Sequence, residues 1–506
     1  MKKVNQLKAG VILSYASMIV TNIISIIYTP IMLRLLGKSE YGLYSLVSSV
    51  VSNLSLLNLG FSSAFMRFYS KYKVKDDKEG MARLNGMFLI IFSIIGLITV
   101  IVGSILVFNV ENIFERTLSS SEISTARVLM TLMVFNMAIS FPDNVLSSNI
   151  TANECYLFQR SITLLRAILN PFLTLPLLLM GYKSISLVLV TTLLTVVGIL
   201  LNIWYSFKKL KIKFIFNNFD FSLLKQIWAF SFFIFLNMIT DQINWSVDKF
   251  ILGMVSGTTV VAVYTIGAQI NHYYLTFSSS ISSVFIPKVN RIVAKNNDNN
   301  ELTRLFTKVG RIQFIVMSFI LTSFIIFGKY FISVWAGEGY ETSYYIALIL
   351  IVPVTIPLIQ NVGIEIQKAK NMHRFRSVLY VSIALCNILL SIPLAKAFGG
   401  VGSAIGTSIA ILVANCIIMN IYYHKKVGLD MIYFWNQIGE FVPALIIPII
   451  AGAVIMFVIG VNSIPKFILL AIVYSCIFVF SMWKFGMNNT EKDLFRGPIN
   501  KILRRK

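Results

Sequence analysis

An apolar hairpin from Leu7 to Tyr72 turns at the stretch Arg34-Leu35-Leu36-Gly37-Lys38-Ser39-Glu40-Tyr41-Gly42-Leu43-Tyr44. A second copy of this plan follows residue 224. There the chain reads Asp248-Lys249-Phe250-Ile251-Leu252-Gly253, then a turn of small residues, then Tyr264. Counted from Tyr44 and from Tyr264, each copy reaches a basic residue after 27 positions. The repeated plan predicts a chain of two related halves.

The ends of the two halves repeat with better register. Five residues recur 217 positions later, namely Asn170, Pro176, Tyr205, Lys208 and Lys209 as Asn387, Pro393, Tyr422, Lys425 and Lys426. Repeated halves in a membrane chain are typical of transporters.

Composition places the chain in a lipid bilayer. Of its 506 residues 57% are apolar and only 13% are charged, with a mean hydropathy of +0.78, whereas about a quarter of a soluble domain is charged. The net charge of +23 is explained by basic loops on the cytoplasmic side, and we expect no nucleic-acid partner. The first apolar run continues past 20 residues behind Met1-Lys2-Lys3 without a cleavage pattern, so we expect a retained span.

The sequence offers no pattern for a metal, a cofactor or an enzyme. Its four cysteines contain no CxxC pair, and its three histidines lie far apart. Neither a phosphate-binding glycine loop nor a GxSxG nucleophile turn occurs. We therefore expect a protein without cofactor that is not an enzyme.

The predicted fold class is all-α, a polytopic membrane protein of about 14 transmembrane helices, because a helix needs about 20 apolar residues to cross the hydrocarbon. The expected spans are 9–35, 42–69, 84–109, 126–150, 161–181, 184–207, 224–252, 258–287, 305–328, 343–366, 377–397, 401–423, 439–461 and 464–485. With the N-terminus inside, all but nine of the 44 Lys and Arg face the cytoplasm, which predicts that both termini are cytoplasmic.

The expected domains follow from the repeat. Residues 1–207 form one six-helix lobe and residues 224–423 a second in the same orientation, since six spans return the chain to its starting side. Residues 424–506 add two helices and a basic tail. The link 208–223 carries phenylalanines among its lysines and is either an amphipathic segment on the membrane surface or a plain basic linker.

Two groups of residues resemble a known family. They are Leu36-Gly37-x-x-x-Tyr41-Gly42-x-Tyr44 with Asn58-Leu59-Gly60-Phe61 and Arg67-Phe68, and in the second half Asp248-Lys249-x-x-Leu252-Gly253 with Val263-Tyr264. Their joint placement resembles the polysaccharide transporter family, which includes the Wzx-type flippases and belongs to the multidrug/oligosaccharidyl-lipid/polysaccharide exporter superfamily. The likeness covers essentially the whole chain.

The resemblance implies a function. Such proteins move a polysaccharide repeat unit of O-antigen, capsule or another surface polymer, linked to undecaprenyl diphosphate, across the bacterial inner membrane by alternating access. It also implies a polysaccharide polymerase and other assembly proteins as partners. Transport of a charged diphosphate needs a polar, partly cationic cavity, so ionisable groups inside the spans are the candidates for its wall. Coupling to H⁺, to Na⁺ or to neither stays open.

The seventh span offers a candidate cavity wall around Asp241. At helical spacing one face carries Asn237, Asp241, Asn244, Trp245 and Asp248. The alternative is an interhelical hydrogen bond or an ion pair with Lys249. Lys249, near the outer end of the span, is itself a candidate.

Further candidates lie in other spans. Asn22 is expected to contact sugar or to pack against a neighbouring helix. Four cations are candidates for attracting the diphosphate at the cytoplasmic mouth, or else anchor the helix ends at the membrane surface: Arg67, Arg166, Lys288 and Arg311. His272 and Tyr273 provide faces for sugar stacking or for helix packing.

Three rival functions stay open. A cation-coupled multidrug extruder is less favoured because no Asp or Glu precedes Glu40. A lipid II flippase is less favoured because the first span has only the terminal Arg34 and the eighth only Lys288 at its exit. A membrane glycosyltransferase or polymerase would be expected to carry acidic residues in a long external loop, and the expected outer loops are short.

Overall fold

The computed structural model describes residues 6–217, 221–493 and 496. Every regular element in these ranges is a helix, which confirms the all-α class. Eleven of the described helices are long and apolar enough to cross a membrane, so the chain is a multi-pass membrane protein. The count of fourteen stays a prediction. The run Arg374–Val427 counts once, although Gly399 interrupts it with a φ of 57° and a ψ of −135° between two expected spans.

The chain divides into two compact units, Met1–Val263 and Tyr264–Lys506, and each is described by itself. The division falls inside helix α11 (Thr258–Ser283), not at the link 208–223 that we expect between two repeated lobes. The lobes predicted from the repeat stay a prediction.

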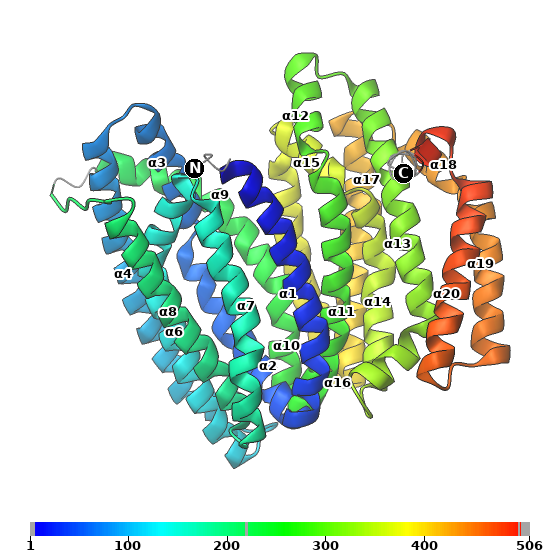
Figure 1. Cartoon of the computed structure of the whole chain (residues 1–506), viewed down its shortest axis with the longest axis horizontal. Helices are drawn as coiled ribbons and strands as arrows, with labels where there is room; N and C mark the ends of the chain where they lie inside the picture. The colour runs from blue at the N-terminus through cyan, green and yellow to red at the C-terminus, as the bar shows by residue number, and fades with distance from the viewer. Residues whose placement is uncertain (1–5, 218–220, 494–495, 497–506) are drawn as a thin grey trace, which may run out of the picture. The chain divides into compact units, whose positions relative to one another are not determined.

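Unit 1, which runs from blue to green in Figure 1, contains the first ten α-helices. They are α1 (Gln6–Leu36), α2 (Lys38–Ser52), the 3₁₀ turn η1 (Asn53–Asn58), α3 (Phe61–Val74), α4 (Lys78–Phe108), α5 (Val110–Phe114), α6 (Ser120–Ala152), α7 (Tyr156–Leu179), α8 (Lys183–Lys208), α9 (Phe221–Gln242), the π-helical turn η2 (Ile243–Val247) and α10 (Asp248–Val255).

Unit 2 continues from α11 to the red end of the colour bar in Figure 1. Its elements are α12 (Ile286–Lys295), α13 (Asn299–Trp335), α14 (Glu341–Ile359), α15 (Asn361–Ala369), α16 (His373–Ile411), η3 (Leu412–Ile418), α17 (Met419–Tyr422), η4 (Tyr423–Val427), α18 (Met431–Gly439), α19 (Val442–Val454), η5 (Ile455–Ile459), α20 (Ile464–Ser481) and η6 (Met482–Gly486).

The turns of the N-terminal hairpin occur where the backbone needs glycine. Gly37 separates α1 from α2 with a φ of 76°, and Gly60 begins α3 with a φ of 78°. Residues other than glycine rarely adopt such φ values, because their Cβ atom crowds the carbonyl oxygen. Two glycines of the family-like pattern are therefore required by the backbone.

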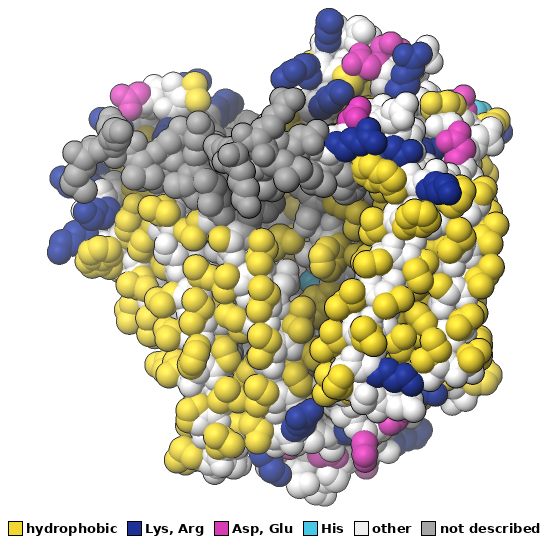
Figure 2. Space-filling model, turned by 45° about the vertical axis from the view of Figure 1, so that its right-hand side comes forward, with side chains coloured by type: hydrophobic (Ala, Val, Ile, Leu, Met, Phe, Trp, Pro, Cys, Tyr) yellow, Lys and Arg dark blue, Asp and Glu magenta, His cyan; other side chains and the backbone are white. Residues whose placement is uncertain are grey.

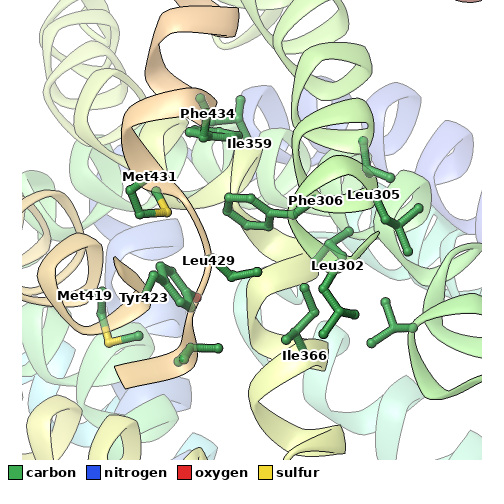
Figure 3. Packing of buried hydrophobic residues seen from close by; sticks show 14 of the residues in the cluster. Leu302, Leu305, Phe306, Ile359, Ile366, Met419, Tyr423, Leu429, Met431 and Phe434 are labelled. Carbon is green, nitrogen blue, oxygen red and sulfur yellow. The ribbon is translucent and has the colours of Figure 1, made fainter. Parts of the chain in front are cut away.

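Each unit has its own buried hydrophobic clusters. In unit 1, Phe61, Phe65, Phe88 and Phe92 pack between α3 and α4. In unit 2, Figure 3 shows side chains of α13, α15 and the segment 419–434 in one cluster around Phe306. Apolar side chains also cover the outside, and the face seen in Figure 2 is largely hydrophobic between charged ends. An apolar exterior is what contact with lipid requires.

The link after α8 lies along α4. Residues 211–216 form no helix, the Ile215 N–H donates to the Ala82 carbonyl at 3.0 Å, and the Asn85 amide donates to the Lys213 carbonyl at 3.0 Å. Gly86 permits this approach, because a Cβ there would overlap the carbonyl oxygen of Ile215. Residues 218–220 of the link lie outside the described residues.

Candidate functional site

The family-like pattern of the N-terminal hairpin is a packing surface. A Cβ on Gly42 in α2 would overlap the backbone carbonyl of Thr258 in the first turn of α11. Farther along α2, Leu46 fills the space left by Gly253 of α10, and Thr117 donates to the Gly253 carbonyl at 2.6 Å. The glycines thus allow two segments distant in sequence to touch through their backbones.

Glu122 joins three segments at the same end of unit 1. Its carboxylate accepts hydrogen bonds from Ser39 at 2.5 Å, from Thr258 at 2.9 Å and from the Ser119 N–H at 2.9 Å. Glu40, next to Ser39, accepts from the side chain and the N–H of Ser184 at the start of α8. Carboxylates at helix N-termini stabilise the exposed N–H groups there. Glu122 and Glu40 therefore hold helix starts together and are satisfied by neighbours.

A second polar group lies within the membrane-spanning part of unit 1, at Asp143 on α6. Its two carboxylate oxygens accept hydrogen bonds from the Asn202 amide of α8 at 3.0 and 2.9 Å. Asn202 is only 4% exposed, and its amide oxygen is buried without a hydrogen-bond partner. Asp143 lies nine residues before the end of α6, roughly 14 Å along the helix.

Arg166 of α7 lies beside this pair. Its guanidinium rests on Gly198 of α8, where any Cβ would overlap it, and donates to the Thr195 carbonyl at 3.4 Å. Asp143 acts on it electrostatically, yet no carboxylate of the described residues lies within 4 Å. The Nε of Arg166 is buried without a partner. An arginine has five N–H donors, and within the described part of the chain the structure gives this one a single long hydrogen bond and a buried Nε that has none.

Sequence reasoning singled out Arg166 but missed Asp143 and Asn202. A local signal existed, because Asp143 is the only acidic residue between Glu122 and Glu154. An isolated carboxylate within an apolar span is a functional candidate by default. Its partner, 59 residues later, has no such signal.

Only part of the predicted face on span seven lies within the described residues. The side chains of Asn237, Asp241, Asn244 and Trp245 lie outside the described residues, and their backbones belong to α9 and η2. Asp248 is 3% exposed, and Lys249 is half-buried. The prediction assumed one α-helical period from 237 to 248, but the π-helical turn η2 adds about one residue to that period. The shared face stays a prediction.

Arg311 is buried inside unit 2. Its guanidinium donates to Glu491 at 2.6 and 3.2 Å, to Glu440 at 2.7 Å and to the carbonyls of Gln437 and Gly486. The Phe441 ring packs against it at 4.4 Å. Arg311 and Glu491 are each 2% exposed. All of its nitrogens are engaged, so in this structure Arg311 joins α13 to the last helices and offers no free donor to a diphosphate.

The other candidates are scattered. Arg67 on α3 is exposed and stacks on the Phe230 ring at 4.4 Å, and Lys288 is exposed on α12. His272 is exposed on α11, whereas the Tyr273 hydroxyl accepts a hydrogen bond from Gln269 at 2.8 Å. Asn22 is half-buried on α1. Among the predicted candidates of unit 1, Arg166 is the one whose charge acts on Asp143 in the described residues.

The fold resembles that of solved transporters. The lipid II flippase MurJ in an inward closed conformation matches with a TM-score of 0.67 and 16% identity, over 94% of this chain and all of that chain. A multidrug resistance MATE family transporter of the MOP superfamily, in an inward-facing conformation, matches with a TM-score of 0.64 and 15% identity, over 81% of this chain and 96% of that one. At these identities the likeness shows the fold.

Sequence comparison gives the family. The uncharacterized membrane protein EpsK of Bacillus subtilis (strain 168) is 20% identical over 93% of both chains. A putative O-antigen transporter of Shigella flexneri is 18% identical over 77% of this chain and 91% of the relative. The family model described as polysaccharide biosynthesis protein matches residues 7–293, which confirms the resemblance noted from the sequence. Because this match covers more than half of the chain, the protein belongs to the polysaccharide biosynthesis protein family.

Proposed function

We propose that this protein is a flippase, which carries an undecaprenyl-diphosphate-linked polysaccharide repeat unit across the bacterial cytoplasmic membrane by alternating access. The family match and the relative named as a putative O-antigen transporter support the substrate class. The fold shared with MurJ supports the transport of a lipid-linked precursor. Both termini face the cytoplasm in this proposal, as the distribution of Lys and Arg favours. The process needs no covalent catalysis.

The observation that carries the proposal is the state of Arg166. A diphosphate loses water when it enters a membrane protein and needs charge-assisted hydrogen bonds in return. Arg166 lies about 15 Å along α7 from its start at Tyr156 and keeps an unpartnered, buried Nε. We assign Arg166 as the phosphate ligand of unit 1. Asp241 and its neighbours on α9 complete the proposed path, with the coupling ion left to experiment.

A lipid II flippase is the second candidate, because the match to MurJ covers 94% of this chain. That substrate also carries a diphosphate on a polyprenyl lipid, so Arg166 would serve either. The two functions differ in which lipid-linked pool builds up when the protein is removed. If the protein is a drug extruder, neither lipid-linked pool builds up when it is removed.

The test is a gene deletion with complementation. We expect the deletion to abolish surface polysaccharide and to leave finished lipid-linked repeat units in the cytoplasmic leaflet. A charge-assisted hydrogen bond contributes about 1.5–3 kcal/mol. Arg166→Gln should therefore restore flipping at a rate about tenfold or more below wild type. Leaflet location is measured with a membrane-impermeant sugar-oxidising reagent on intact and opened cells.

The matched control is Arg160→Gln, which removes an exposed arginine from the same helix. It should complement fully. Asp241→Asn, tested alongside, reports whether that carboxyl is needed. The proposal fails if the deletion leaves surface polymer and repeat-unit pools unchanged. Accumulation of lipid II would select the second candidate, and increased sensitivity to cationic drugs alone would select the extruder.

A further inference from the structure

One side of α8, which packs against α6 and α7, carries a stripe of polar and small residues. Thr195, Gly198 and Asn202 follow one another at spacings of three and four residues, and Gly198 and Asn202 are both buried. Residues so spaced lie above one another on one side of a helix. The stripe runs over about 10 Å, and from Gly198 to Asn202 it covers about 6 Å.

One end of the stripe holds Arg166 weakly. The contact with the Thr195 carbonyl is 3.4 Å long, and Nε has no partner. The guanidinium can lie there only because Gly198 has no side chain. A charged side chain with so few hydrogen bonds in an apolar span raises the free energy of the folded protein. An anion that binds to Arg166 in this position would lower that cost.

At the other end of the stripe lie acceptors that could bind the Arg166 guanidinium. Asp143 provides a carboxylate, and the amide oxygen of Asn202 is a buried acceptor without a donor. The unsatisfied acceptor of Asn202 thus lies about one helical turn, roughly 6 Å, from Gly198, over which the Arg166 guanidinium with its unsatisfied donor lies. A buried polar group without a partner costs about 1–3 kcal/mol, and one movement of Arg166 would satisfy both.

We propose that Arg166 has a second position on α8, in which it pairs with Asp143 and donates to the amide oxygen of Asn202. In the first position, over Gly198, the charge is presented to a phosphoryl anion; in the second it is withdrawn. Asp143 and Asn202 are then positioning residues that compete with the ligand for Arg166. The identity of the anion as a lipid diphosphate rests on the proposed function, whereas the two positions of Arg166 do not.

The test uses the full-length protein in nanodiscs and farnesyl diphosphate as a soluble polyprenyl diphosphate probe. In the ligand-free protein the second position is then the more populated one, so the apparent Kd exceeds the intrinsic Kd by the inverse of the competent fraction. We expect Asp143→Asn to lower the Kd about fivefold or more, because the uncharged Asn side chain at position 143 no longer competes with the ligand for Arg166. Asp143→Glu, which keeps the charge, should stay near wild type. In an Arg166→Gln background Asp143→Asn should have no effect.

Gly198→Ala tests the first position independently, because its Cβ occupies the place of the guanidinium. It should weaken probe binding through a shift of Arg166 toward Asp143. The controls are Glu115→Gln and Arg160→Gln, two exposed charges of unit 1, which should leave the Kd unchanged. Thermal unfolding checks that each variant folds. A folded Asp143→Asn protein with an unchanged or higher Kd overturns the inference.

A second measurement separates this inference from the proposed function. If farnesyl diphosphate binding does not depend on Arg166, the assigned phosphate ligand is wrong. The Tm values of Asp143→Asn, Arg166→Gln and the double variant then decide whether the two residues interact. Groups that pair give non-additive effects. Additive Tm shifts overturn the second position. Asp143 already acts electrostatically on Arg166 over Gly198, so the second position is supported only if the non-additivity increases in a Gly198→Ala background, where the guanidinium cannot occupy the first position.

Discussion

Arg311→Ala is expected to destabilise unit 2 by about 3–5 kcal/mol, because removal of one partner leaves a buried charge uncompensated. Glu491 would keep its 2% exposure and lose both hydrogen bonds to the guanidinium. The Phe441 ring would lose its cationic neighbour as well. Thermal unfolding of the purified protein in detergent measures the effect.

Two variants sharpen this expectation. Arg304→Ala removes an exposed arginine about two turns earlier on α13 and should shift the Tm little. Glu491→Gln keeps the shape of the buried carboxylate and removes its charge. We expect a smaller loss than that of Arg311→Ala, because Arg311 keeps Glu440 and the carbonyls of Gln437 and Gly486. If Arg311→Ala and Arg304→Ala unfold at the same temperature, the network does not stabilise unit 2.

Gly42→Val is expected to separate α2 from the first turn of α11 and to impair both stability and transport. The first atom of any side chain would meet a backbone carbonyl, that of Thr258, which cannot rotate away. Overpacking typically costs about 1–3 kcal/mol, and we expect the upper end because two helices must move apart. The hydrogen bonds from Thr258 and Ser39 to Glu122 would be strained by the same movement.

The measurement combines thermal unfolding with complementation of surface polysaccharide. Gly42→Ala should produce a smaller loss than Gly42→Val, in the order of side-chain volume. Gly439→Ala is the matched control, since a Cβ there meets no atom within 4 Å. A stable and fully active Gly42→Val protein would show that α2 and α11 do not need this close contact.

Local patterns predicted most of the fold. Apolar runs of helical length predicted the spans, and the sequence around Gly37 predicted the first turn, because both properties act within a few residues of chain. The break at Gly399 lies between two expected spans for the same reason. The turn at Gly60 was not predicted, since it lies inside the expected span 42–69. One α-helical period was assumed through span seven, so the π-helical turn after Gln242, which shifts that period by about one residue, was not predicted.

The partners of the buried charges were beyond local reasoning. The Arg166 guanidinium depends on Gly198, which is an ordinary small residue in the sequence of α8. Arg311 looked like a cation at a helix end, and its acidic partner lies 180 positions away. Which carboxylate meets which arginine is decided by helix packing, and the sequence of either helix alone does not contain that information.

The same separation of 180 residues sets an order of events during synthesis. At about 5–20 residues per second, a ribosome needs roughly 10–40 s to pass from Arg311 to Glu491. During that interval Arg311 lacks Glu491, its buried partner in the folded protein. A chain that stops short of Glu491 would retain the defect permanently, even though every helix up to α20 is present. The contact that buries Arg311 thus forms late in synthesis, and every truncation before Glu491 removes it.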